Sequence, residues 1–229
     1  LLFAFASVVQ IPAASAHNAP EPPSTEDLAK LEKYPNAASL RIAQGPQKIT
    51  GLHELAESGA LGMLKDDIVA QLTSADLETV DSSGRRVVDQ FLMSNTVRFA
   101  NAPVKDLLMK YSEGLDAEQQ MTLAVLASDY KALSFVGVSK LRPEHLVQPQ
   151  TVNIPVDEMG GARKVTTNLL LDSIRSRQFD TRLQEIAKGL SAEQKSQAAS
   201  MKDEYGGTIG HYLAQDGNVG RLNDWKEYI

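Results

Sequence analysis

The chain has 229 residues, of which 42% are hydrophobic and 23% charged, so it can build a core either as one domain or as an elongated array. Its net charge of −6 argues against a nucleic-acid polyanion as the main partner, and an aromatic content of 6% argues against base-stacking platforms. The chain has no Cys, which excludes disulfides, thiolate nucleophiles and Cys-ligated zinc.

The first residues have the pattern of a secretory leader. Residues 1–9 are apolar and uncharged, and Ala14-Ser15-Ala16 is a small-x-small cleavage site. We expect residues 1–16 to be the remnant of a signal peptide and the protein to be exported, either periplasmic or secreted. The alternative is a buried N-terminal helix in a cytoplasmic protein. The apolar run is too short for a comfortable membrane span, so we expect no integral span in the mature chain.

The next segments are expected to form a linker and the N-terminal end of an array. Residues 17–23 contain three Pro and predict an extended linker. Ser24 or Thr25 can cap a helix within residues 24–39, where apolar residues fall at helical spacing. We expect this helix to cover the N-terminal end of the array, because a terminal repeat needs a distinct outer face.

The stretch from Thr50 to Gly59 predicts a short capped helix. The Thr50 hydroxyl can accept from an amide of the first turn, and His53, three positions later, can bond back toward the cap. Gly59 lies where the chain must turn. The apolar side of this helix consists of Leu52, Leu55 and Ala56. A helix of about two turns is unstable alone, so it needs neighbours.

This pattern recurs near the C-terminus at one constant offset, which indicates an internal repeat. The recurring residues are Thr208, His211, Leu213, Ala214 and Gly217. Thr-x-Leu-His-x-Leu-Ala-x-x-Gly resembles the core pattern of ankyrin repeats. Asp81-Ser82-Ser83-Gly84-Arg85-Arg86 resembles the hairpin tip of that family, and Asp203 to Thr208 resembles the same tip with one extra residue. The family's Pro after the Thr is missing, and Gly51, Val87 and Ile209 stand there instead.

The resemblance implies an all-α, ankyrin-type solenoid of stacked helix pairs with short hairpin-like tips. We expect about five units in residues 40–229, the last one incomplete; they span about 40–72, 73–110, 115–141, 142–190 and 191–229. The structural residues of the repeat are Thr50, His53, Gly59, Gly84, Thr208, His211 and Gly217.

Several finer expectations belong to this division into units. We expect second helices at about 61–72 and 179–190, a first helix at 166–174, and an extended insertion at 148–154. Residues 122–127 align with residues 51–56, and Asn95 takes the place of Gly59. Ser74-Ala75-Asp76, Asp116-Ala117-Glu118, Arg142-Pro143-Glu144 and Ser191-Ala192-Glu193 predict one recurring short helical turn between units.

No motif for catalysis or metal binding is complete. His53-Glu54-Leu55-Ala56-Glu57 lacks the second His of the zinc-protease helix. Ser128-Asp129-Tyr130-Lys131 fits Ser-x-x-Lys but lacks the supporting motifs of penicillin-binding enzymes. Residues 160–164 lack the end of a phosphate-binding loop. We therefore expect no enzyme activity, no metal and no cofactor.

The predicted function is a protein-protein interaction module or scaffold that binds another protein on its concave face. The family binds partners through tips and first helices, and the residues that vary there are Ser82, Arg85, Gln90, Tyr205, Tyr212, Gln215 and Asp216. We expect a monomer and no nucleic-acid partner. The alternative is the targeting arm of a larger exported enzyme or toxin whose catalytic part lies outside this sequence.

Overall fold

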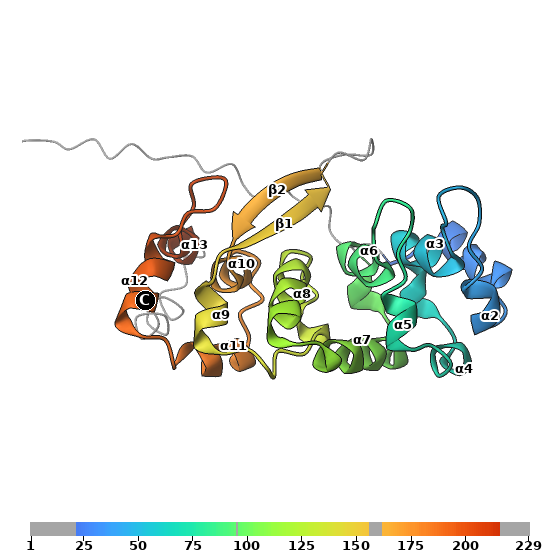
Figure 1. Cartoon of the computed structure of the whole chain (residues 1–229), viewed down its shortest axis with the longest axis horizontal. Helices are drawn as coiled ribbons and strands as arrows, with labels where there is room; N and C mark the ends of the chain where they lie inside the picture. The colour runs from blue at the N-terminus through green and yellow to red at the C-terminus, as the bar shows by residue number, and fades with distance from the viewer. Residues whose placement is uncertain (1–21, 95, 156–161, 216–229) are drawn as a thin grey trace, which may run out of the picture.

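The computed structural model describes residues 22–94, 96–155 and 162–215, and this part of the chain is mostly helical (Figure 1). Its α-helices are α1 (Thr25–Ala29), α2 (Ala37–Leu40), α3 (Gly51–Ser58), α4 (Asp66–Val69), α5 (Ser74–Leu77), α6 (Val87–Met93), α7 (Ala102–Gly114), α8 (Ala117–Asp129), α9 (Pro143–Val147), α10 (Leu169–Arg175), α11 (Thr181–Ala187), α12 (Ala192–Ser200) and α13 (Ile209–Gln215). Short 3-10 helices are η1 (Lys30–Lys33), η2 (Ala60–Met63), η3 (Val97–Phe99) and η4 (Leu133–Phe135). None of these helices has the length and apolarity that a membrane crossing requires.

Five helices form a row along the long axis of the molecule. Helix α3 packs on α6, α6 on α8, α8 on α10 and α10 on α13 (Figure 1). Helices α4, α7 and α11 lie below this row in the same view. One continuous cluster of buried apolar side chains extends from Tyr34 to Leu213, so each helix is stabilised by its neighbours in the row.

Three helices of this row end in the same way. Gly59, Lys131 and Arg177 have φ values of 77°, 59° and 62°, in the left-handed region. Their amides donate to Ala56, Ser128 and Ile174, each over 3.1 Å. Lys131 therefore takes the place of Gly59 at the end of its helix, but the helix starts differ, because Thr50 caps α3 whereas Thr122 lies inside α8, which Asp116 caps. The expected alignment of residues 122–127 with residues 51–56 is not reproduced, because Gly51 begins α3 whereas Thr122 lies in the interior of the longer helix α8. Asn95 lies outside the described residues.

The segment after α3 differs from the helix expected at 61–72. The segment consists of η2, an extended Leu64 and α4. Carbonyl groups that a continuous helix would use internally accept from Asn101, just before α7, instead. Asn101 donates from its backbone amide to the Gly62 carbonyl (2.8 Å) and from Nδ2 to the Leu64 carbonyl (2.7 Å).

The expected insertion at 148–154 is extended, as predicted. Strand β1 (Gln150–Pro155) pairs antiparallel with β2 (Ala162–Thr167), with Gln150 opposite Thr167. This pairing corrects the expected helix at 166–174, since its first residues belong to β2 and Asn168 caps α10 instead. The expected short turns after Asp116 and Ser191 are also corrected, because these residues cap α8, of 13 residues, and α12, of 9 residues.

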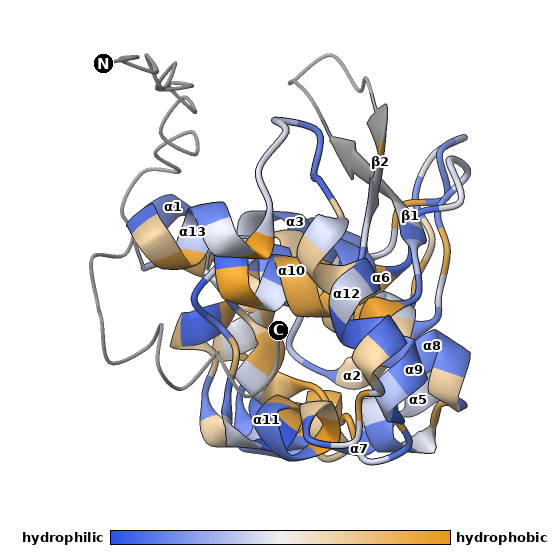
Figure 2. Ribbon diagram, turned by 90° about the vertical axis from the view of Figure 1, so that its left-hand side faces the viewer, coloured by the Kyte–Doolittle hydropathy of each residue, from blue (hydrophilic) through white to orange (hydrophobic). Residues whose placement is uncertain are grey.

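Three shorter loops accompany the hairpin. We call residues 44–49 the first tip, residues 81–85 the second tip and residues 203–207 the last tip. The tips and the β1–β2 hairpin rise from one side of the helix row (Figures 1 and 2). The Ser82 amide of the second tip donates to the Gln47 carbonyl of the first (2.9 Å), so these two tips are joined.

Candidate functional site

The second and last tips have the same length and the same hydrogen bonds. Asp81 Oδ1 accepts from the amides of Ser83 (2.8 Å) and Arg85 (3.0 Å). Asp203 Oδ1 accepts from the amides two and four residues later in the same way, over 3.0 and 2.8 Å. Gly84 and Gly206 have φ values of 77° and 78°. The expectation of one extra residue in the last tip is therefore wrong, because the same closing bonds span the same number of residues.

Two of the seven expected partner-binding residues are buried and form hydrogen bonds to the tips. Gln90 is 6% exposed and donates to Asp81 Oδ2 over 3.4 Å, and Tyr212 is 8% exposed and donates to Asp203 Oδ2. Burial and the bond to Asp203 raise the pKa of Tyr212, so its phenol remains a donor. The expectation that Gln90 and Tyr212 present their side chains to a partner is corrected: both are buried anchors of a tip.

Other expected partner-binding residues are exposed. Ser82 and Arg85 lie on the second tip, Tyr205 on the last tip, where it is 43% exposed, and Gln215 at the end of α13. Arg85 Nε is 2.8 Å from Asp81 Oδ2, so the Arg85 guanidinium is partly neutralised by a carboxylate of its own tip. Asp216 and Gly217 lie outside the described residues, as do the expected signal-peptide remnant and most of the linker.

The three His residues within the described ranges all hold helix starts. His53 Nδ1 accepts from the Thr50 amide (3.2 Å) and lies 2.8 Å from its hydroxyl, and His211 repeats both distances with Thr208. His145 Nδ1 accepts from the Arg142 amide in α9 (2.9 Å). Sequence reasoning missed this third case, although His145 also follows its cap by three residues. No group of residues suited to a metal ion occurs in the described part of the chain.

The Ser-x-x-Lys motif is not assembled as a nucleophile pair. Ser128 is buried and its Oγ lies 2.9 Å from that of Ser176, whereas Lys131 is exposed in the left-handed turn after α8. The Ser128 hydroxyl thus makes a contact between α8 and the end of α10.

A buried charge network lies where α8, α10 and the last tip meet. Arg175 Nη2 is 2.7 Å from Asp129 Oδ1 and 2.9 Å from Asp172 Oδ1, and its Nη1 is 3.8 Å from Asp203 Oδ2. Thr167 donates to Asp172 Oδ1 over 2.9 Å. Sequence reasoning missed this network. The available signal was Asp172 itself, an acid inside the apolar run from Leu169 to Ile174.

Burial raises the pKa of Asp172 to about 7. The Arg175 guanidinium lowers it, Asp129 raises it further, the Thr167 hydrogen bond lowers it and Asp203 raises it. Burial is the largest influence on the pKa of Asp172, because this residue is 1% exposed and shares the single Arg175 guanidinium with two other acids. Asp172 therefore exchanges its proton near neutral pH, unlike an ordinary surface carboxyl.

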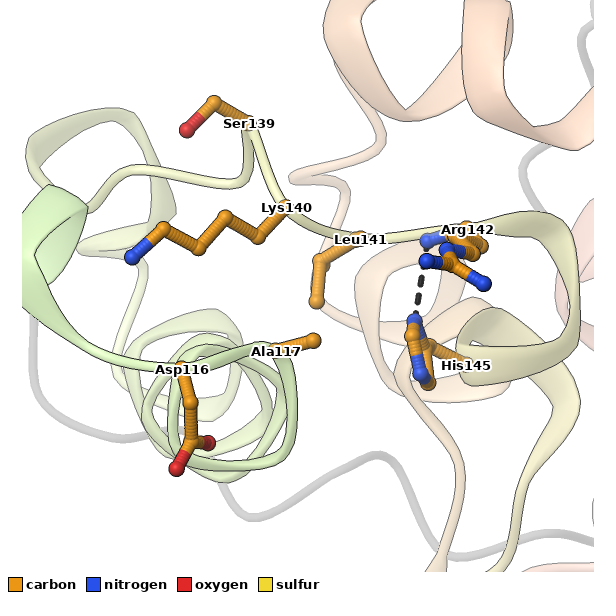
Figure 3. Close-up of a pocket in the computed structure, with 7 residues that line it drawn as sticks. All are labelled: Asp116, Ala117, Ser139, Lys140, Leu141, Arg142 and His145. Carbon is orange, nitrogen blue, oxygen red and sulfur yellow. Dashed lines mark hydrogen bonds between the residues drawn. The ribbon is translucent and has the colours of Figure 1, made fainter.

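An open pocket of about 740 Å³ lies between the start of α8 and α9 (Figure 3). It is lined by Asp116, Ala117, Ser139, Lys140, Leu141, Arg142 and His145. Lys140 Nζ donates to the Leu115 carbonyl, and His145 Nδ1 is occupied by the Arg142 amide, as the dashed line in Figure 3 shows. Lys140 thus holds the end of α7 and His145 the start of α9, and the pocket brings together none of the expected partner-binding residues.

No protein-family model matches the chain, and neither the curated proteins nor the solved structures include a significant match.

Proposed function

We propose that the chain is an ankyrin-like solenoid and acts as a protein-protein interaction module or scaffold. A partner protein would bind the face formed by the tips and the row α3, α6, α8, α10 and α13. The proposed binding site is a surface and not a pocket, because a stacked array offers an extended face without a deep pocket.

The observation that carries this proposal is the recurrence of one helix unit in a packed row. A left-handed residue lies nine positions after the helix cap in two members of the row, from Thr50 to Gly59 and from Asn168 to Arg177, and α8 ends in the same left-handed turn at Lys131 with the same closing hydrogen bond. The units pack in chain order, and their tips project from one side. A surface built in this way repeats its framework while its exposed residues vary.

The side chains best placed for recognition are those on the projecting tips. Tyr205 exposes 43% of its surface although its neighbour Asp203 is buried, and Ser82 is exposed on the second tip. Large aromatic side chains contribute strongly to binding hot spots. The tips are closed by internal hydrogen bonds, so a partner would meet preorganised loops, which lowers the entropic cost of binding.

The experiment isolates a partner with the full chain as bait and measures its Kd by calorimetry. The double variant Ser82→Glu with Tyr205→Ala should weaken binding at least tenfold while thermal unfolding is unchanged. Ser134→Glu is the matched control, because Ser134 is exposed in η4, which packs on α7 and α8 but belongs neither to the tips nor to the five helices of the row. Weaker binding by Ser134→Glu, with full binding by the tip variant, would place the interface elsewhere and contradict the proposal.

A further inference from the structure

Arg175 and its three acids join separate parts of the row. Asp129 ends α8, Asp172 and Arg175 lie on α10, and Asp203 opens the last tip. The side chains of Asp172 and Asp203 are 1% and 0% exposed, and that of Arg175 is 10% exposed. With every acid ionised, one positive charge faces three negative charges, which is costly where little water can screen them.

The three acids do not share the guanidinium equally. Nη2 is within 2.9 Å of both Asp129 and Asp172, whereas the approach to Asp203 is 3.8 Å. The remaining bonds of Asp203 stay within the last tip and α13, from the amides of Tyr205 and Gly207 and from the Tyr212 phenol. The attraction of Arg175 is therefore the charge contact that ties the tip carboxylate to α10, and an ionised Asp172 both competes for Arg175 and repels Asp203.

We propose that Asp129, Asp172, Arg175 and Asp203 form a proton-operated latch that docks the last tip on α10 when Asp172 is protonated and loosens it when Asp172 is ionised. The proton is exchanged with bulk water. The consequence for binding rests on the proposed function, because the last tip carries the exposed Tyr205.

The groups around Asp172 support the direction of this switch. Helix α8 contributes Asp129, the end of β2 contributes Thr167, the last tip contributes Asp203, and α13 contributes the Tyr212 phenol. Helix α9 also packs on α10, but its buried residues are Leu146 and Val147, while Glu144 is exposed and His145 half-buried. A buried acid with acidic neighbours takes up its proton more readily than in the unfolded chain, so the latch closes as pH falls through about 7.

The second tip is an internal control for the last tip. It has the same closing bonds, but its acid, Asp81, is paired with its own Arg85 (2.8 Å). Burial alone would raise the pKa of Asp81, yet the hydrogen bonds from the Arg85 amide and guanidinium and from the Ser83 amide lower it. Asp81 therefore stays ionised across the range in which Asp172 titrates.

The experiment follows backbone amide resonances of the full chain by NMR from pH 5.5 to 8.5. The amides of Tyr205 and Gly207 should titrate with a midpoint near the pKa of Asp172, while those of Ser83 and Arg85 in the second tip stay constant. Asp172→Asn carries a neutral side chain of the same shape, and it should hold the last tip at its low-pH position. Asp129→Asn removes a negative neighbour and should move the midpoint to lower pH.

Two results would overturn the latch, namely constant shifts of Tyr205 and Gly207 in the native chain, or an unchanged titration of these amides in Asp172→Asn. If a variant does not fold, the titration of the Tyr205 and Gly207 amides in the native chain decides whether the latch exists. The test needs no partner, so its failure is separate from that of the proposed function. A chain that binds no protein would refute the binding role while the tip still titrated.

Discussion

Tyr212 donates the hydrogen bond of its phenol to Asp203, a buried carboxylate nine residues earlier in the chain. Gln90 donates to Asp81 across the same interval in the second tip. In both cases the fourth residue of the helix anchors the acid that opens the tip. The two anchors differ in chemistry but occupy one position, which explains how a variable residue can have a structural role.

Removing the anchor should loosen the last tip. Tyr212→Phe keeps the ring in the core but leaves Asp203 Oδ2 without its phenol donor, and the expected cost is about 1–3 kcal/mol. Urea unfolding measures it. Tyr205→Phe is the comparison, because its side chain is 43% exposed and a change within about 0.5 kcal/mol is expected. Equal losses in the two variants would argue against the anchoring role.

The two capping histidines, His53 and His211, should differ in their contribution to stability. His211→Ala removes an exposed back-bond to the cap and should cost about 1 kcal/mol. His53 is 1% exposed, so His53→Ala also leaves a void, and a loss of about 2–4 kcal/mol is expected. Chemical denaturation tests both. His211→Gln should recover most of the loss because Gln can also bond back to the cap; no recovery would contradict the capping role.

Two glycines with the same φ should respond differently to Ala. Both Gly59 and Gly84 have a φ of 77°, which costs a side chain about 1–2 kcal/mol. A Cβ on Gly59 would lie 1.5 Å from Thr96 Oγ1, whereas a Cβ on Gly84 meets nothing within 4 Å. We expect Gly59→Ala to be more destabilising than Gly84→Ala by at least about 1 kcal/mol in thermal unfolding. Adding Thr96→Ala should reduce that difference; if it does not, the clash is not its cause.

The pKa of Asp172 predicts an unusual pH dependence of stability. It is raised to about 7 in the folded chain, against about 3.9 in an unfolded one. Between these values the folded chain holds a proton that the unfolded chain has lost, so the free energy of unfolding falls as pH rises. From pH 5 to pH 7 this contribution should be on the order of 2 kcal/mol, at 1.36 kcal/mol per pH unit.

Asp172→Asn should remove this slope. Urea unfolding of both chains at pH 5, 6, 7 and 8 gives the comparison, in which contributions from other groups cancel. Asp76 and Asp81, whose pKa values are lowered, contribute the opposite slope only below about pH 4, outside this window. Parallel curves for the two chains would mean that Asp172 keeps an ordinary pKa.

Helix α3 could be predicted from sequence because its signals are local. Thr50, His53 and Gly59 act within ten residues, and each makes the cap or turn that its type predicts. The same holds for the extended segment at β1 and for the caps Asp116 and Ser191, whose side chains accept from amides in the first turns of α8 and α12. The length of the helix that follows each cap was not predictable, because it depends on packing beyond the first turn.

The sequence by itself determined the helix caps at Thr50, Asp116 and Ser191, the left-handed turn at Gly59 and the tips that open at Asp81 and Asp203, since these depend on bonds among neighbouring residues. Only the tertiary structure decided that Gln90, Asp172 and Tyr212 are buried and that the segment after Gly59 is not one helix. Those outcomes depend on contacts between distant residues, such as Asn101 with Leu64, 37 positions apart, and Arg175 with Asp129, 46 positions apart. A polar side chain is stabilised inside the core by its partner, and folding supplies that partner from a distant part of the chain.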